Sequence, residues 1–316
     1  MELNVLITAP YMQPEIDKFK SVFEDNNIQI HLPPVKERLC EEELIRWIDG
    51  VHGVISGDDQ FTERVLKQAK NLKVISKWGT GIDSIDVGAC SRLGIAVRNT
   101  PNAFSEPVAD TVIGYLLCFA RQLLNMNQNM KEGSWHKIPG VSLAECTLGV
   151  IGVGNLGKAV VRRATAFNMQ ILGNDLVELP SDFIQGTGLE LTTKEDLLKK
   201  SDFVSLNCDL NSTSYHIMRA NEFKKMKSTA FLINTARGPL VDESALIAAL
   251  QNKEIAGAAL DVFEVEPLPE DSPLRAMQNV LIAPHNANSS PQAWERVHKS
   301  TINNLLDVLL NIKGNN

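Results

Sequence analysis

The sequence predicts an α/β protein built from two doubly wound parallel sheets. Three observations carry this prediction. Short apolar runs alternate with helix-like stretches over the first hundred residues, a long helical pattern follows, and the alternation then resumes at Leu148. Alternation of this kind buries parallel strands between layers of helices. The length of 316 residues agrees with two domains, since a domain has roughly 150 residues.

The first alternation contains strand candidates and the helices between them. The expected strands cover residues 4–8, 28–32, 53–55 and 74–77. The expected helices cover residues 15–26, 41–49 and 62–70.

A single long helix is expected from residue 106 to about residue 131, ending near Gly133. The second alternation then supplies six strand candidates, which complete a doubly wound sheet. These candidates are residues 148–151, 170–173, 203–206, 230–233, 256–259 and 280–283. Residues 291–312 have the apolar spacing of one amphipathic helix.

Charge and composition exclude several classes of protein. The net charge of -7 provides no broad basic field, which argues against binding to nucleic acid or to a membrane surface. The longest apolar run, residues 112–120, is too short to span a membrane, and residues 1–10 lack the basic region of a secretion signal. The five cysteines have no CxxC spacing. We therefore expect reduced thiols, no metal site and a cytoplasmic location.

A glycine motif follows the first strand of the second alternation. Gly152, Gly154 and Gly157 stand after the apolar residues 148–151, with Asn155 and Leu156 between them and a helical pattern after them. In this setting the first glycine permits a tight turn, the second lets a pyrophosphate approach, and the third lets the helix pack on the strand. Glycines can also serve only to turn the chain, but the strand and helix on either side favour a dinucleotide site.

Asp175 lies 18 residues after Gly157, close to the roughly 20 residues at which an acidic side chain binds the adenosine ribose. A carboxylate accepts hydrogen bonds from a 2′-hydroxyl and repels a 2′-phosphate. Residues 176–178 contain no Arg or Lys that would bind such a phosphate. The sequence therefore favours NAD over NADP, although a solvated turn residue remains the alternative for Asp175.

Three polar residues, Arg237, Glu266 and His285, each follow a predicted strand, at the sheet edge where open α/β folds bind ligands. Reduction of a 2-oxo acid needs a cation for the carboxylate, a proton donor for the carbonyl oxygen and a hydride source. A carboxylate beside the histidine would fix its tautomer and raise its pKa. Taken singly, each residue also fits a structural role.

These motifs together resemble the D-isomer-specific 2-hydroxyacid dehydrogenase family over nearly the whole chain. The similarity is greatest to its phosphoglycerate dehydrogenase branch and the short relatives of that branch. The matching stretches are residues 77–86, 99–102, 148–157, 201–207, 231–242, 257–267 and 284–285.

The resemblance implies specific roles. Arg237 would bind the substrate carboxylate, His285 would act as acid and base, and Glu266 would be its carboxylate partner. Thr80 and Gly81 would donate backbone N–H groups to the carboxylate, and Asp261 would hold the nicotinamide carboxamide. The remaining residues that would line the cofactor cleft are Cys208, Thr235 and Ala236.

The resemblance also implies the domain organisation. A Rossmann NAD-binding domain, residues 100–286, would be inserted into a flavodoxin-like substrate domain formed by residues 1–99 and 287–316. The long helix after Asn99 commonly crosses to a partner subunit in this family, so a homodimer is expected.

The sequence departs from phosphoglycerate dehydrogenases where these carry a basic stretch such as R-S-A-T-K. Residues 56–60 read Ser-Gly-Asp-Asp-Gln here, and two carboxylates would repel a phosphate. Lys77 and Arg98 remain either as anion partners or as solvated side chains. Asn286 and Asn288 either bind substrate hydroxyls or are turn residues. The 2-hydroxy acid substrate, phosphorylated or not, is therefore left open.

Two other functions share this fold. One is an NADH-sensing binding protein similar to corepressors, which residues alone do not separate from an enzyme. The other is a formate-type dehydrogenase, in which a glutamine stands where this chain has Glu266.

Overall fold

The computed structural model describes residues 2–313, with side chains to residue 311, and the chain divides into two compact units. One unit comprises residues up to Ala103 together with those from Ser290 onward, and the other is Phe104–Ser289. Each division lies a few residues after the boundary predicted from the sequence. Within the described range, no helix combines the length and apolar character needed to cross a membrane.

The sheet of the first unit is parallel throughout and has five strands within the described residues, in the order β2-β1-β3-β4-β5. This is the flavodoxin-like order. The strands are β1 (Leu3–Ile7), β2 (Ile28–His31), β3 (Gly53–Ser56), β4 (Val74–Lys77) and β5 (Ala96–Arg98). The four expected strands are present, and β5 is additional because its three residues are too short to produce a periodic pattern.

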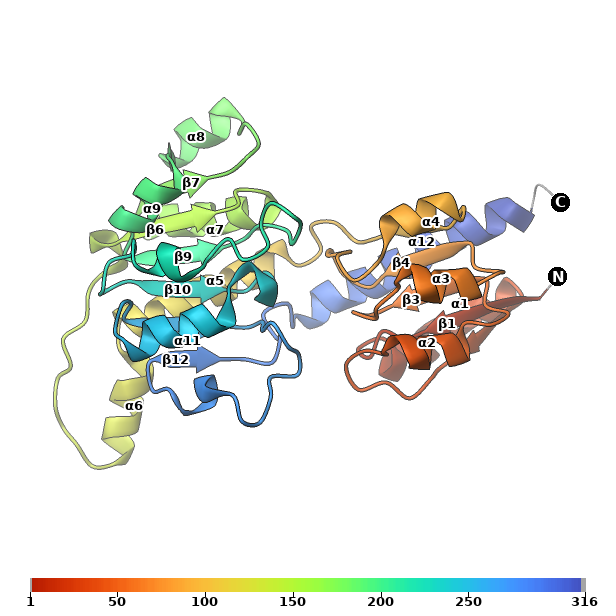
Figure 1. The fold of residues 1–316 in the computed structure, drawn as a ribbon, viewed down its shortest axis with the longest axis horizontal. Helices are drawn as coiled ribbons and strands as arrows, with labels where there is room; N and C mark the ends of the chain where they lie inside the picture. The colour runs from red at the N-terminus through yellow and green to blue at the C-terminus, as the bar shows by residue number, and fades with distance from the viewer. Residues whose placement is uncertain (1, 314–316) are drawn as a thin grey trace. The chain divides into compact units, whose positions relative to one another are not determined.

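The helices of the first unit include one from the far end of the chain. They are α1 (Lys20–Asp25), α2 (Glu41–Trp47), α3 (Glu63–Gln68), α4 (Val87–Arg92) and α12 (Pro291–Lys313). The helix expected at residues 15–26 begins instead as a 3-10 helix, Gln13–Phe19, before α1. The side chains of Leu305 and Leu309 in α12 lie where a Cβ on Gly53 would point. This close packing places α12 beside β3 and β4 (Figure 1).

The second unit has a parallel sheet of seven strands in the described part of the chain, ordered β12-β11-β10-β9-β6-β7-β8. The strand order reverses next to β6, which pairs with both β7 and β9. The carboxyl ends of such neighbours form a ligand crevice. The strands are β6 (Thr147–Ile151), β7 (Gln170–Asn174), β8 (Glu190–Leu191), β9 (Phe203–Leu206), β10 (Phe231–Asn234), β11 (Gly257–Leu260) and β12 (Val280–Ile282).

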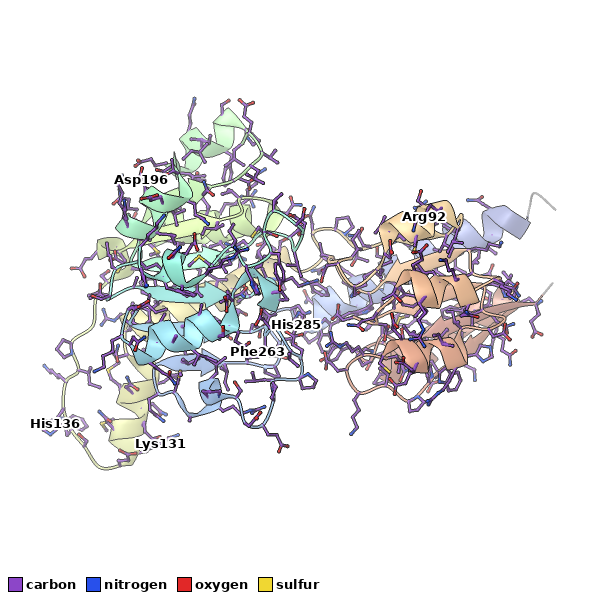
Figure 2. All side chains as sticks on the ribbon, in the orientation of Figure 1. Arg92, Lys131, His136, Asp196, Phe263 and His285 are labelled. Carbon is purple, nitrogen blue, oxygen red and sulfur yellow. The ribbon has the colours of Figure 1, made fainter. Side chains whose placement is uncertain are left out.

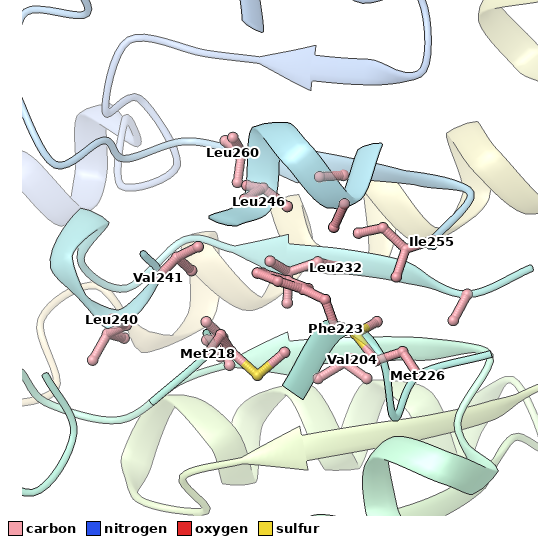
Figure 3. Close-up of a cluster of buried hydrophobic side chains, with 14 of the residues drawn as sticks. Val204, Met218, Phe223, Met226, Leu232, Leu240, Val241, Leu246, Ile255 and Leu260 are labelled. Atoms are coloured by element: carbon pink, nitrogen blue, oxygen red, sulfur yellow. The ribbon is translucent and has the colours of Figure 1, made fainter. Parts of the chain in front are cut away.

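Helices cover both faces of this sheet, and alternate strand residues belong to different cores. Leu232 belongs to a core with Phe223 of α10 and Leu246 of α11 (Figure 3), which also includes residues of α9, whereas Ile233 belongs to a core with residues of α5 and α7. Strands buried on both faces read as continuous apolar runs, which is why the sequence revealed them. The helices are α5 (Ser105–Ala120), α6 (Leu123–Lys131), α7 (Asn155–Ala166), α8 (Ser181–Thr187), α9 (Lys194–Lys200), α10 (Ala220–Phe223) and α11 (Glu243–Gln251).

The prediction of one helix over residues 106–131 is wrong, because the chain forms α5 and α6 with a break between them. Gln122 has a left-handed φ of 54°, and its side-chain amide donates to the carbonyl of Phe119. The carbonyl of Ala120 accepts a hydrogen bond from the backbone N–H of Val141, 2.9 Å away. The segment that contains Val141 therefore caps the C-terminus of α5. The hydrophobic periodicity of residues 106–131 cannot reveal a cap that comes from outside the helix.

Candidate active site

The glycine turn leaves open space beside the start of α7. Gly152 has a φ of 84°, and a Cβ there would lie 2.6 Å from the backbone nitrogen of Cys208. A Cβ on Gly157 would lie 2.1 Å from the carbonyl oxygen of Gly152. A Cβ on Gly154 would meet no atom within 4 Å. The first and third glycines are thus required by the protein's own packing, whereas the second faces room for a ligand at a helix N-terminus.

Asp175 holds the glycine turn from the end of β7. Its Oδ2 accepts a hydrogen bond from the backbone N–H of Val153 at 2.5 Å, and its Oδ1 accepts one from Val177 at 2.9 Å. The next residue, Leu176, is 86% exposed. The carboxylate therefore lies beside the glycine turn, as expected of the residue that binds the adenosine ribose.

The opposite wall of this crevice follows β9 and β10. The backbone N–H of Asn207 donates to Ile151, which draws Cys208 against the glycine turn. Burial raises the pKa of the Cys208 thiol to about 11. The hydroxyl of Thr235 is buried and has no hydrogen-bond partner among the described residues. An orphan hydroxyl and an open turn are the features that a polar dinucleotide would satisfy.

Asn155 and Leu156 open α7, between the second and third glycines. Ala236 lies next to Thr235, and its backbone N–H donates to the side chain of Asn234 at 3.2 Å. The residues that the sequence assigns to the cofactor from Gly152 to Ala236 therefore lie at the carboxyl ends of β6, β7, β9 and β10, either in the turns there or at the start of α7.

His285 and Glu266 form a hydrogen-bonded pair. The Nδ1 of His285 lies 3.1 Å from Oε2 of Glu266, and the two side chains are 23% and 21% exposed. Glu266 Oε1 accepts a hydrogen bond from the backbone N–H of Phe263 at 2.9 Å. Figure 2 labels Phe263 and His285, which lie on the loops after β11 and β12. A carboxylate at Nδ1 directs the other ring nitrogen of the histidine toward proton exchange.

Arg237 follows β10 and lies close to the loop that carries Glu266. Its Nη1 donates to the carbonyl of Ala236 at 2.8 Å, and its own carbonyl accepts from the side chain of Asn234. A Cβ on Gly238 would lie 1.9 Å from the backbone of Phe263, so the two turns touch through their main chains. Because β10, β11 and β12 are neighbours, the turns that bear the three expected catalytic residues lie at one edge of the sheet.

Asp261 lies beneath the His285 turn and is 1% exposed. Its carboxylate accepts hydrogen bonds from the backbone N–H groups of Asn286 and Ala287 at 2.8 and 2.9 Å, while its carbonyl accepts from the N–H of His285 at 2.7 Å. Burial raises the pKa of this carboxyl above its usual value. Asp261 thus holds the histidine turn, in addition to the cofactor contact that the resemblance implies.

The Asn286 side chain accepts a hydrogen bond from the hydroxyl of Ser289 at 2.6 Å. This contact is typical of a turn residue, which is one of the two roles that the sequence left open for Asn286.

The residues expected to bind substrate lie in the first unit, at the end of β4 and in the turn after it. Lys77 is buried with its side chain 4% exposed, and its Nζ lies 2.9 Å from Oδ1 of Asp58. The hydroxyl of Thr80 donates to the carbonyl of Thr100 at 3.0 Å, which steadies the turn that contains Gly81. Sequence reasoning noted Asp58 as a carboxylate that repels phosphate but missed it as the partner of Lys77.

The described residues contain no group of three or more His, Cys, Asp or Glu side chains that could hold a metal ion.

Residues 113–287 match the family model for the NAD binding domain of D-isomer specific 2-hydroxyacid dehydrogenases. The chain belongs to this family. The dehydrogenase is 35% identical to the glyoxylate reductase of Korarchaeum cryptofilum, over 97% of this chain and 92% of that protein. It is 37% identical to the D-3-phosphoglycerate dehydrogenase of Methanocaldococcus jannaschii, over 92% of this chain but 54% of that protein.

Solved structures agree with this assignment. The dehydrogenase is similar to the D-lactate dehydrogenase of Aquifex aeolicus complexed with NAD and lactic acid, with a TM-score of 0.86 and 28% identity. The similarity covers 98% of this chain and 96% of that one. The predicted family, fold class, enzyme class and NAD cofactor are thereby confirmed.

Proposed function

We propose that this dehydrogenase interconverts a small D-2-hydroxy acid and its 2-oxo acid with NAD. The observation that carries the proposal is the His285–Glu266 pair at 3.1 Å. The pair lies in the same unit as the glycine turn, on the loops after β12 and β11, and β11 is the neighbour of the β10 strand that precedes Arg237. A proton donor, a cation and a dinucleotide site are the three requirements of this reaction.

Each residue of the site has a defined task in this proposal. Bound NAD supplies the centre that accepts a hydride from the substrate or returns it. The guanidinium of Arg237 binds the substrate carboxylate through paired hydrogen bonds. His285 exchanges a proton with the oxygen on the reacting carbon, and Glu266 fixes the tautomer of the ring through Nδ1. Thr80 and Gly81 donate backbone N–H groups to the substrate carboxylate.

The nucleotide would be held by the turns at the sheet edge. The backbone N–H groups from Gly152 to Gly157 would bind the pyrophosphate at the N-terminus of α7. Asp175 would accept hydrogen bonds from the ribose hydroxyls, while Cys208, Thr235 and Ala236 would line the crevice and Asp261 would contact the nicotinamide carboxamide.

We propose further that the substrate carries no phosphate, although the sequence is similar to the phosphoglycerate dehydrogenase branch. Asp58 neutralises Lys77 at 2.9 Å, so this cation is committed to a partner within the chain. A free phosphate group would have to displace that carboxylate and would meet its negative charge. The names of two relatives, both glyoxylate reductases at 35% and 37% identity, support a small unphosphorylated 2-oxo acid.

A panel of 2-oxo acids tests the substrate. Glyoxylate, hydroxypyruvate, pyruvate and phosphohydroxypyruvate are each assayed by the loss of NADH absorbance. We expect the unphosphorylated acids to have the higher kcat/KM. A preference for phosphohydroxypyruvate over hydroxypyruvate would contradict the proposed substrate class.

Two alanine substitutions test the mechanism. His285→Ala and Arg237→Ala should each lower kcat/KM by about 10²- to 10⁴-fold, the usual contribution of a general acid or a bound carboxylate partner. NADH binding, measured by fluorescence, should persist in both variants. His136→Ala, a change on an exposed loop, is the matched histidine control. Unaltered turnover in either test variant removes that residue from the mechanism.

We also propose a homodimer joined through α6 and the segment after it. No residue of α6 is buried within the chain, and Trp135 is 85% exposed. The exposed apolar side chains of this surface are Leu123, Leu124, Met130, Trp135 and Val141. Clustered apolar exposure is typical of protein interfaces. Light scattering should give a dimer for the natural protein and a monomer for the Leu124→Lys, Trp135→Lys double variant.

A cytoplasmic location is proposed from the five free cysteines, because reducing compartments keep thiols unpaired. Cell fractionation of the producing organism checks this location.

A further inference from the structure

The loop that carries Glu266 contains a second histidine–carboxylate pair. Glu264, two residues earlier, hydrogen-bonds through Oε1 to Nε2 of His216. One loop therefore presents two glutamates to two different histidines, since Glu264 faces His216 and Glu266 faces His285. The His216–Glu264 pair lies outside the set of catalytic residues that the family resemblance implies.

Glu264 is also joined to the start of α11 by reciprocal hydrogen bonds. Its backbone N–H donates to Oε2 of Glu243 at 3.2 Å, and the backbone N–H of Glu243 donates to Oε2 of Glu264 at 3.4 Å. Burial raises the pKa of the Glu243 carboxyl above its usual value. The carboxylate of Glu264 thus connects three segments of the chain that are distant in sequence.

The His216 segment is tied in turn to the residues that follow Arg237. The backbone N–H of His216 donates to the carbonyl of Pro239 at 2.9 Å, and that of Met218 donates to Leu240 at 3.1 Å. Gly238 touches the backbone of Phe263, so the Arg237 turn is pressed against the Glu266 loop. The His216–Glu264 hydrogen bond therefore adds a second connection between the residues that follow Arg237 and the loop that carries Glu266.

The backbone of His216 is left-handed. Its φ is 50°, in a region that few residues other than glycine occupy, although histidine, asparagine and aspartate are enriched there. The ring of Tyr215 stacks on the imidazole with the centroids 4.0 Å apart. Strained backbone persists where surrounding contacts over-determine it, and here those contacts lead to the loops of Arg237 and Glu266.

We propose that His216 and Glu264 are positioning residues that hold the loop of residues 261–267 in the register where Glu266 faces His285. The effect on catalysis rests on the proposed function. The effect on the hydrogen bond between His285 and Glu266 does not. Loss of the pair should loosen the His285–Glu266 hydrogen bond 3.1 Å long without touching substrate or cofactor directly.

Nuclear magnetic resonance tests the geometric consequence without any turnover. In protein labelled with ¹⁵N-histidine, the Nδ1–H proton of His285 is assigned by its loss in Glu266→Ala. We expect Glu264→Ala to shift or broaden this resonance, and Glu264→Gln, which keeps an acceptor for His216, to restore it. Glu270→Ala, which changes an exposed glutamate of the following segment, is the control and should leave it unchanged.

His216→Asn separates the contact from the backbone strain. Asparagine tolerates the left-handed φ, but its side chain is too short to replace the imidazole at Glu264. We expect His216→Asn to remain folded and to shift the His285 resonance as Glu264→Ala does. This variant keeps the proposal testable if Glu264→Ala does not fold.

Kinetics then test the coupling to catalysis. Glu264→Ala should lower kcat about 10-fold with the KM for NADH unchanged, and should lower it no further when Glu266 is already glutamine, because residues that act through one another are not additive. An unchanged His285 resonance in a folded variant, or additive losses in the double variant, overturns the proposal. Absence of turnover with every 2-oxo acid would refute the proposed function while the resonance still decides this inference.

Discussion

Alanine at Gly152 is expected to destabilise the protein, whereas alanine at Gly154 is expected to leave its stability unchanged and to weaken NADH binding. The two glycines belong to one turn, yet the protein uses them differently. A Cβ on Gly152 meets backbone atoms of Asn207 and Cys208 at 2.6 to 2.8 Å, whereas a Cβ on Gly154 meets nothing within 4 Å. The pair therefore separates the packing of the protein from the space left for the cofactor.

The cost of Gly152→Ala has two parts. The φ of 84° costs a residue with a Cβ about 1–2 kcal/mol, and the displacement of backbone atoms adds about 1–3 kcal/mol, as overpacking does. A loss of about 2–5 kcal/mol lowers the Tm of a domain of this size by roughly 4–20 °C. Gly154 has a φ of -69°, which alanine adopts freely, so the apoprotein of Gly154→Ala should keep its Tm.

NADH binding by Gly154→Ala should nevertheless weaken by about 10- to 100-fold, because the new methyl group fills space that the pyrophosphate needs. Scanning calorimetry of the apoprotein and fluorescence titration with NADH give the two quantities. Full NADH affinity in a folded Gly154→Ala variant would refute our placement of the pyrophosphate. An unchanged Tm in Gly152→Ala would refute the packing argument.

Three further predictions follow from the site. Asp175→Asn keeps the side-chain oxygen for Val153 but removes the charge, so the ratio of kcat/KM with NAD to that with NADP should fall by about 10-fold or more; a constant ratio counts against the ribose contact. The pKa of Cys208, about 11, leaves roughly one thiol in a thousand ionised at pH 8. Iodoacetamide should therefore label the exposed Cys40 first, and the rate at Cys208 should rise about tenfold per pH unit up to pH 11; equal rates at pH 8 would contradict the burial of Cys208. Asp58→Asn releases the charge of Lys77, so kcat/KM for phosphohydroxypyruvate should increase relative to hydroxypyruvate, and an unchanged ratio would show that the pair does not set specificity.

Much of the candidate site was predictable because each of its residues belongs to a short, recognisable stretch of sequence. The glycine turn, Asp175 and the residues Arg237, Glu266 and His285 each follow an apolar run, and parallel strands bring their carboxyl ends to one edge. Strand positions were equally accessible, since strands buried on both faces are uniformly apolar. The short strands β5 and β8 were not predicted, because a run of two or three residues has no measurable hydrophobic period.

The pairs that act across the chain were not predictable. Lys77 meets Asp58, and His216 meets Glu264 from 48 residues away. No local sequence pattern predicts such contacts, because a charged side chain is equally compatible with exposure to solvent, and only the fold shows which partner lies beside it. The break between α5 and α6 has the same origin, since the backbone N–H of Val141, 21 residues downstream, donates to the carbonyl of Ala120.

The amino-acid sequence alone determined the fold class and the cofactor motif, and it supplied the residues of the proposed catalytic set, because these depend on periodicity and on the chemistry of short segments. The tertiary structure decided which charges neutralise one another, where α5 ends and how the Glu266 loop is held. Those outcomes depend on distances between segments remote in sequence, and electrostatic and hydrogen-bond energies change steeply over a few ångströms.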